Sequence, residues 1–245
     1  MIDLKDKRIM VTGASSGIGR CSARVLSHFG ATILLIARNE ENLRRTKEQL
    51  AGDDHLVYSC DLSDASSIEP LFGRIHSDVG AIDGLVHCAG VGPSRPLKNT
   101  TTEFIQQVLD INFLAFAELV RVFSLKKYHN DRSSIVGVSS IESTIGLPAN
   151  EAYCGSKGAL DSFINCATKE LYAKNIRVNS VQPGWVKTEL AEKYLLEISG
   201  GSEESLSKLQ KAVMPEEVAY VIAFLMSDLS SGINGTHIPV MGKQW

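Results

Sequence analysis

Seven short apolar runs recur along this 245-residue chain, and segments with helical spacing lie between them. The runs are continuous rather than alternating, which is expected of strands covered on both faces. Strands that alternate with helices predict a doubly wound α/β fold, with a mostly parallel sheet and helices on both faces. The runs are RIMVT (8–12), ATILLIA (31–37), HLVYSC (55–60), DGLVHC (83–88), SIVGVS (134–139), IRVNSV (176–181) and THIPV (236–240).

Helix boundaries and chain length complete this outline. Gly30 stands where the first helix should end, and Pro215, followed by two glutamates, suits a helix start. The length fits one domain over 1–245. The segment 189–214 breaks the rhythm, because it is long and rich in Glu, Lys and Ser. We expect one or two mobile helices there that cover a ligand crevice, with a solvated surface excursion as the alternative.

The composition excludes several classes of protein. A net charge of -3 with scattered basic residues offers no surface for nucleic acid. No apolar run approaches the ~20 residues of a membrane helix, and the first ten residues lack a signal-peptide core, so we expect a cytoplasmic protein. The five cysteines are widely spaced and fit buried free thiols, and no metal-binding motif occurs.

A glycine-rich turn, Thr12 to Gly19, follows the first predicted strand and opens the first predicted helix. In that position backbone N–H groups and the helix N-terminus can face a pyrophosphate. The same residues match the G-x-S-x-G turn of hydrolases around Ser15, with Asp228 and His237 following in hydrolase order. A hydrolase needs a backbone N–H from an earlier strand-helix loop to complete its oxyanion hole, and no such loop precedes Ser15. The topology therefore excludes the hydrolase alternative.

With this turn, the later motifs make the chain resemble the short-chain dehydrogenase/reductase family over its entire length. The resemblance is carried by Tyr153-Cys154-Gly155-Ser156-Lys157, Ser139-Ser140-Ile141, Asp61-Leu62, Ala89-Gly90, Asn112, and Pro183-Gly184 with Thr188. In length and layout the chain is similar to the 3-oxoacyl-carrier-protein reductases. The resemblance implies a single-domain Rossmann fold with a seven-stranded parallel sheet.

The resemblance also implies a catalytic tetrad of Asn112, Ser140, Tyr153 and Lys157. Tyr153 and Lys157 share one helix face, because residues four apart are neighbours there. A nearby ammonium stabilises a phenolate, so Lys157 would help Tyr153 protonate the forming alkoxide while it also holds the nicotinamide ribose. Ser140, which lies thirteen residues before the tyrosine as in the family, would hydrogen-bond the same oxygen, and Asn112 would support a proton-returning water.

The implied cofactor is NADP(H) in preference to NAD(H). The strand that should carry the ribose-binding residue ends in Ala37-Arg38, so a guanidinium and not a carboxylate is offered to a 2′-phosphate. Ser16 stands where many NADP enzymes of the family have a second cation. The expected cofactor-binding residues are Gly13, Ser15, Ser16, Gly17, Ile18, Gly19, Arg38, Asp61, Leu62, Ala89, Gly90, Tyr153, Lys157, Pro183, Gly184, Val186 and Thr188.

Two segments depart from the family pattern. His87-Cys88 replaces the usual Asn-Asn before Ala89-Gly90, and we interpret His87 as a buried histidine with local partners. The C-terminal residues 239–245 replace the usual Val-Asp-Gly-Gly, so no substrate can be copied from a relative.

These features together predict an NADPH-dependent reductase that converts a carbonyl, in a 3-oxoacyl thioester or another ketone, to a secondary alcohol. Two alternatives stay open: a dehydrogenase acting on a sugar, steroid or polyol, and a non-catalytic NADP-binding redox sensor. A homodimer or homotetramer is expected from the family. Four apolar residues could form its interface or belong to the core: Phe113, Leu114, Phe116 and Phe163.

Overall fold

The computed structural model describes residues 1–188 and 211–242, and it contains one seven-stranded sheet in which every strand pair is parallel. The strand order is β3-β2-β1-β4-β5-β6-β7. The predicted fold class is therefore confirmed. The strands are β1 Arg8–Thr12, β2 Thr32–Ala37, β3 Leu56–Ser59, β4 Ile82–His87, β5 His129–Val138, β6 Arg177–Pro183 and β7 His237–Val240.

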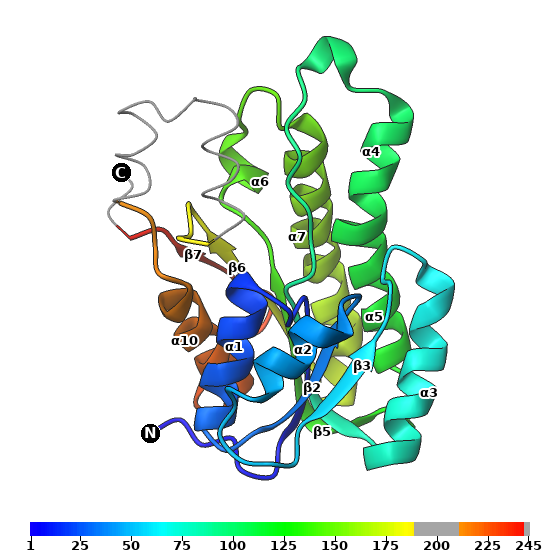
Figure 1. Cartoon of the computed structure of the whole chain (residues 1–245), viewed down its shortest axis with the longest axis vertical. Helices are drawn as coiled ribbons and strands as arrows, with labels where there is room; N and C mark the ends of the chain where they lie inside the picture. The colour runs from blue at the N-terminus through cyan, green and yellow to red at the C-terminus, as the bar shows by residue number, and fades with distance from the viewer. Residues whose placement is uncertain (189–210, 243–245) are drawn as a thin grey trace.

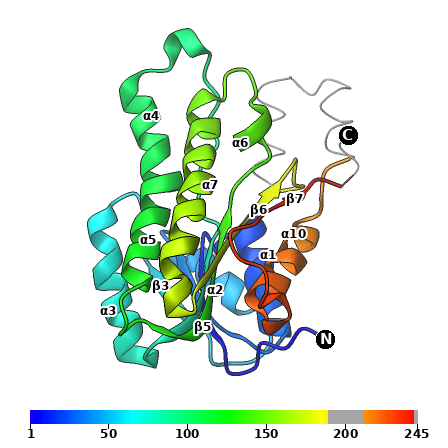
Figure 2. The same ribbon diagram turned by 180° about the vertical axis from the view of Figure 1, so that it is seen from behind.

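Helices cover both faces of this sheet, as the continuous apolar runs predicted (Figures 1 and 2). In β1, Ile9 and Val11 pack toward α1 and α10, whereas Met10 packs toward α3, α5 and α7. Both sides of the strand are thus buried, which explains why its sequence does not alternate. The longer helices are α1 Gly17–His28, α2 Glu40–Lys47, α3 Ile68–Val79, α4 Thr102–Leu109, α5 Ala115–Phe123, α7 Glu151–Leu171 and α10 Pro215–Met226, and a single turn forms α6, Glu142–Ile145.

The predicted helix boundaries at Gly30 and Pro215 are confirmed. Gly30 follows the end of α1 with a φ of +97°, a backbone conformation that favours glycine. Pro215 is the first residue of α10, and the Glu217 carboxylate accepts a 2.7 Å hydrogen bond from the Met214 N–H. The Glu217 N–H in turn donates to the Met214 carbonyl at 3.0 Å, so the two residues close the first turn, and Pro215 suits its first position.

A π-helical turn, Asp110–Leu114, joins α4 to α5. The segment with helical spacing in the sequence, from Phe104 to Leu114, is thus helical, but not all of its apolar residues are buried. Ile105 and Leu114 are 36% and 40% exposed, whereas Val108 is buried. The wider turn rotates the residues after Asp110 around the helix axis, which is how π-turns often reposition a functional side chain.

The order of the strands places the ligand crevice. The connection from β1 runs outward to β2 on one side, and β4 lies against β1 on the other, so the direction of winding reverses between β1 and β4. In doubly wound sheets the ligand binds at the carboxyl ends of the strands at such a switch point. The glycine-rich turn after β1 and the Ala89-Gly90 pair after β4 both lie there.

The predicted lid, 189–214, falls almost wholly outside the described residues. Its last residues are described: Val213 is buried and forms a parallel bridge with Val186. The Lys187 N–H donates to the Val213 carbonyl, and the Val213 N–H donates to the Trp185 carbonyl, both at 2.8 Å. This end of the segment is thus tied to the chain that follows β6.

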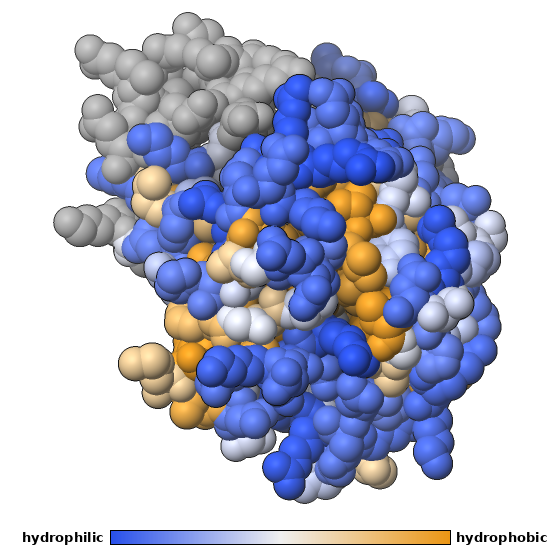
Figure 3. Space-filling model, turned by 60° about the horizontal axis from the view of Figure 1, so that its bottom comes forward, coloured by the Kyte–Doolittle hydropathy of each residue, from blue (hydrophilic) through white to orange (hydrophobic). Residues whose placement is uncertain are grey.

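The surface agrees with the scattered charge of the sequence. One face of the molecule is mainly hydrophilic, with apolar side chains gathered in a band across it (Figure 3). Within residues 1–188 and 211–242, no helix combines the length and apolar character needed to cross a bilayer.

Candidate active site

Two adjoining cavities lie at the switch point. The larger, of about 540 Å³, is bounded by the glycine-rich turn, and the smaller, of about 200 Å³, is bounded by the start of α7. They share the walls formed by Ile18, Cys88, Gly90, Val91 and Thr188, so one ligand could extend through both. Of the predicted residues, the larger is lined by Gly13, Ser15, Ser16, Gly17, Ile18, Gly19, Arg38, Leu62, Ala89, Gly90 and Thr188, and the smaller by Ile18, Gly90, Ser140, Tyr153, Lys157, Pro183, Gly184, Val186 and Thr188.

Glycine is required at two points of the turn after β1. A Cβ at Gly13 would lie 2.8 Å from the Ala89 nitrogen, and a Cβ at Gly19 would lie 2.2 Å from the Gly13 carbonyl oxygen. The turn therefore packs its bare backbone against β4 and against the start of α1. This close packing leaves the cradle that a dinucleotide pyrophosphate needs, so the residues present fit a nicotinamide dinucleotide.

Thr46 and Arg20, which the sequence analysis did not single out, hydrogen-bond to the backbone of this turn. The Thr46 hydroxyl donates to the Ala14 carbonyl at 2.9 Å, and the Arg20 guanidinium donates to the Ser15 carbonyl and to the Thr46 hydroxyl. These bonds hold the turn in place through the carbonyls of Ala14 and Ser15. Thr46 lies thirty-two positions from Ala14, so no local motif could identify it.

Arg38 lines the larger cavity at the end of β2, as predicted. The acidic residues nearest in sequence are bound elsewhere: Glu40 accepts from Arg44 at 2.6 Å, and Glu41 pairs with Arg45 at 2.5 Å. Both pairs connect residues four apart on α2, and neither glutamate lines the cavity. The end of β2 therefore presents a cation and no carboxylate.

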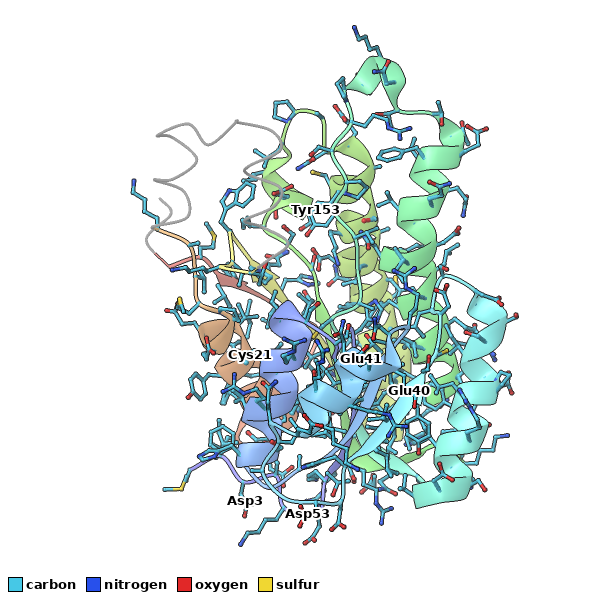
Figure 4. All side chains as sticks on the ribbon, in the orientation of Figure 1. Asp3, Cys21, Glu40, Glu41, Asp53 and Tyr153 are labelled. Atoms are coloured by element: carbon cyan, nitrogen blue, oxygen red, sulfur yellow. The ribbon has the colours of Figure 1, made fainter. Side chains whose placement is uncertain are left out.

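Lys157 and Tyr153 lie on α7 beside the carboxyl end of β5, with Tyr153 near the start of that helix and next to α6 (Figure 4). The Lys157 ammonium donates to the Val138 carbonyl at 2.9 Å and stands 5.8 Å from the Tyr153 ring centre. Burial lowers the pKa of Lys157 to about 8, although Asp161, one turn further along α7, opposes this shift. The predicted side-by-side arrangement is thus present, and the ammonium is held by a backbone carbonyl.

The two neighbouring serines at the end of β5 have different partners. The Ser139 hydroxyl donates to the buried Asp161 carboxylate at 2.8 Å. The Ser140 hydroxyl accepts a 3.2 Å hydrogen bond from the Glu142 N–H, and no acceptor for its own proton is present among residues 1–188 and 211–242. Ser140, the residue chosen by spacing, therefore keeps a donor for a ligand in the smaller cavity.

Asn112 and Asp61 line neither cavity. Asn112 sits in the π-turn, fully buried, and exchanges two hydrogen bonds with the backbone of Val91, at 2.8 and 2.9 Å. Its amide also donates to the Ser156 hydroxyl at 3.0 Å, so it ties the chain after Gly90 to α7. Asp61 accepts from the Ser63 hydroxyl and N–H, which together lower the pKa of its carboxyl. The roles predicted for these two residues stay predictions.

His87 is fully buried, as expected of a histidine with local partners. Its Nδ1 lies 3.0 Å from the Thr12 hydroxyl, which accepts from the Ala89 N–H. The Thr12–His87 contact thus joins β1 to β4, with either atom able to donate depending on the histidine tautomer. Burial, together with the Lys157 charge, lowers the pKa of His87 to about 3.

The rejected hydrolase alternative finds no support in the geometry. His237 Nδ1 contacts the Ser180 hydroxyl at 2.7 Å, and its Nε2 lies 3.1 Å from Asn165 Oδ1. Asp228 is exposed and faces Lys7 at 3.8 Å. Asp228 and His237, the two residues that would complete a hydrolase triad with Ser15, thus contact other residues.

Sequence reasoning missed several residues of the smaller cavity. Glu142, Asn150 and Trp185 line it beside Ser140 and Tyr153. Trp185 directly follows the predicted Pro183-Gly184 pair, and Glu142 stands two residues after Ser140, so proximity to a motif could have indicated both. Asn150 gave no such signal, because its place depends on the packing of α6 against α7.

Comparison with known proteins identifies the family. The sequence model of the family described as "Enoyl-(Acyl carrier protein) reductase" matches residues 13–242. The chain is 33% identical to the 3-oxoacyl-(acyl-carrier-protein) reductase FabG of Rickettsia conorii over 245 residues, which is 99% of this chain and 98% of that protein. It is 30% identical to the D-threitol dehydrogenase of Mycolicibacterium smegmatis over 241 residues, 98% of this chain and 93% of that one.

A solved structure points the same way. The short-chain type dehydrogenase/reductase from Mycobacterium ulcerans superimposes with a TM-score of 0.89 at 28% identity, and the match covers 99% of this chain and 90% of that one. Family oxidoreductases of this kind use a nicotinamide cofactor. The chain therefore belongs to the short-chain dehydrogenase/reductase family of oxidoreductases.

Proposed function

We propose that this protein is an NADPH-dependent reductase that converts a ketone to a secondary alcohol. The observation that carries the proposal is that Ser140, Tyr153 and Lys157 line one cavity, which adjoins the cavity of the glycine-rich turn. The residues there can bind a carbonyl oxygen, donate a proton to it and hold the cofactor's ribose.

The carbonyl oxygen would lie between the Ser140 and Tyr153 hydroxyls. Ser140 accepts from the Glu142 N–H and so can turn its own proton to that oxygen. The bound nicotinamide supplies the hydride that reduces the carbonyl carbon. Tyr153 donates its proton to the developing alkoxide, and the Lys157 ammonium stabilises the phenolate left behind.

NADP(H) is the proposed form of the cofactor. Arg38 offers two parallel N–H donors to a 2′-phosphate, which suits a bidentate contact. Glu40 and Glu41 are paired with arginines of their own helix, so neither opposes that phosphate at the cavity wall.

The test is the oxidation of NADPH, followed by absorbance, in the presence of ketones, 3-oxoacyl thioesters and keto-sugars. We expect turnover of at least one class, with a fall of about 10²–10⁴-fold in kcat for Tyr153→Phe. Tyr172→Phe, an exposed tyrosine at the far end of α7, is the matched control. Tight NADPH binding without turnover of any compound would contradict the proposal and favour a redox sensor.

A second candidate is oxidation of a polyol or sugar alcohol, since the same residues serve both directions. The observation in its favour is the acidic side chain of Glu142 in the smaller cavity, an acceptor for a substrate hydroxyl. The similarity to a D-threitol dehydrogenase supports it as well. Rates measured with NADP⁺ and polyols, beside those with NADPH and ketones, distinguish the two.

We also propose a homodimer or homotetramer. Leu114 is 40% exposed just before α5, whereas Phe116 is fully buried. Phe113 and Phe163 are partly buried, pack edge to face against each other and contact the core. Leu114 is thus the member of the predicted set with the most surface to offer a second copy, and light scattering of the purified chain measures the result. All five cysteines are free, which supports a reducing compartment such as the cytoplasm.

A further inference from the structure

The smaller cavity contains one acidic side chain among its described lining residues, that of Glu142. Glu142 is the first residue of α6, and its N–H donates to the Ser140 hydroxyl at 3.2 Å. Its carboxylate accepts from the Asn150 amide at 3.0 Å, and the Cys154 thiol lies 3.9 Å from the same oxygen, Oε2. Asn150 is the N-cap of α7 and Cys154 follows Tyr153 on that helix, so the Glu142 carboxylate is held against the first turn of α7, in the cavity that Ser140 and Tyr153 also line.

One oxygen of this half-buried carboxylate has no protein partner among the described residues. Within residues 1–188 and 211–242 no lysine, arginine or histidine forms an ion pair with Glu142, and no group donates a hydrogen bond to its second oxygen, Oε1. Burial raises the pKa of the Glu142 carboxyl. Glu142 is half-buried, and Oε1 is not among the buried atoms that lack a partner, so water reaches it. A ligand that displaces this water must supply a donor of its own, because an acceptor left desolvated and unpaired is costly.

The ligand group must therefore donate a hydrogen bond close to the reacting carbon. Hydroxyl and ammonium groups both donate, but the Lys157 ammonium lines the same cavity and disfavours a second cation. A plain hydrocarbon next to the carbonyl would leave the carboxylate desolvated and unpaired. A hydroxyl meets both requirements.

We propose that the Glu142 carboxylate binds a hydroxyl on the carbon next to the reacting one, so that the enzyme takes hydroxyketones, or vicinal diols in the reverse direction. The inference rests on the proposed function, because it takes the carbonyl oxygen to lie at Ser140 and Tyr153. It narrows the ketone class, since an unsubstituted 3-oxoacyl chain has no such hydroxyl.

The experiment compares kcat/KM for matched pairs of a hydroxyketone and its deoxy analogue, beginning with acetoin and butanone. We expect the wild type to prefer the hydroxyketone by at least about hundredfold, since a site built to bind a hydroxyl rejects the analogue that lacks it. In Glu142→Leu the ratio should fall close to one. The ratio does not depend on the fraction of folded protein, and Glu142→Gln, which keeps an oxygen for Asn150, gives a second variant whose preference should also fall.

Glu151→Gln is the matched control, because Glu151 is exposed on the first turn of α7 and should leave the ratio as in the wild type. A wild-type ratio near one, or an unchanged ratio in Glu142→Leu, would overturn the inference. If the enzyme still reduces ketones and this activity depends on Tyr153, the proposed function stands in either case. A preference for aminoacetone over hydroxyacetone would overturn the assignment of a hydroxyl. If the wild type reduces no ketone at all, both the proposed function and this inference are contradicted.

Discussion

The Lys157 ammonium donates a 2.9 Å hydrogen bond to the backbone carbonyl of Val138, the last residue of β5. The bond fixes a buried cation, 5% exposed, at the strand end that borders the smaller cavity. Because burial lowers the pKa of Lys157 to about 8, the charge of this group changes within an accessible pH range. Cofactor binding should therefore depend on pH.

The first prediction concerns this pH dependence. NADPH affinity should be greatest below the Lys157 pKa of about 8 and weaken as the pH rises through it, because the ammonium that attracts the cofactor is lost. Titrations of cofactor fluorescence across that range measure the Kd. Lys157→Met should bind more weakly throughout and show no inflection near 8. A wild-type Kd that stays constant over this range would contradict the assignment of Lys157 to the cofactor.

The second prediction separates the neighbouring serines. Ser140→Ala should lower kcat by about 10²-fold with little change in unfolding free energy, because it removes a donor aimed at the reacting oxygen. Ser139→Ala should instead lower the unfolding free energy by about 1.5–3 kcal/mol, since Ser139 donates to the buried Asp161 carboxylate. Steady-state kinetics and urea unfolding on both variants provide the comparison. Equal kinetic effects of the two substitutions would contradict the assignment of the catalytic hydroxyl to Ser140 alone.

The third prediction concerns cofactor choice at Arg38. Arg38→Asp should shift the ratio of kcat/KM for NADPH over NADH by about tenfold to hundredfold toward NADH, because a charge-assisted contact is replaced by repulsion of the 2′-phosphate. Arg45→Asp, on the exposed side of α2, is the control for a general change in charge. If the two variants shift the ratio equally, long-range charge and not a contact at Arg38 is responsible.

The fourth prediction concerns acid stability and His87. Its pKa falls from 6.5 to about 3 in the folded state, so below about pH 6.5 the unfolded chain takes up a proton that the folded chain does not. The unfolding free energy should then decrease on acidification by up to about 1.4 kcal/mol per pH unit from this group alone. Urea unfolding at about pH 7 and about pH 5 should show a smaller decrease for His87→Asn than for the wild type.

The exposed His28 gives the control for this measurement, and His28→Asn should keep the decrease of the wild type. An identical loss of stability in His87→Asn would show that other groups dominate the acid response.

Much of the fold was predictable because its signals are local. Apolar runs such as RIMVT correspond to β1 residue for residue, and β5 began only a few positions earlier than its apolar run suggests. That early part of β5, from His129, is polar and exposed in part, so hydrophobicity could not indicate it. Where the strand is covered on both faces, burial and sequence pattern agree.

Part of the candidate site was local as well. The i, i+4 spacing of Tyr153 and Lys157 follows from helix geometry alone, and the glycines after β1 belong to a strand-helix turn that any such sheet presents at its carboxyl edge. These features predicted the family, the cavity and the residues at its centre.

The tertiary structure decided the rest, because hydrogen-bond partners come from distant parts of the chain. Only packing shows that the π-turn buries Asn112 against Val91 and Ser156. In the same way, only packing shows that Ser139 donates a hydrogen bond to Asp161, whereas Ser140 does not. The place of Glu142 in the cavity also depends on packing, because the sequence around it is that of an ordinary exposed helix start. Its carboxylate belongs to the cavity because α6 packs on α7 and brings Asn150 to it, a relationship set by the meeting of two elements and by no pattern within either.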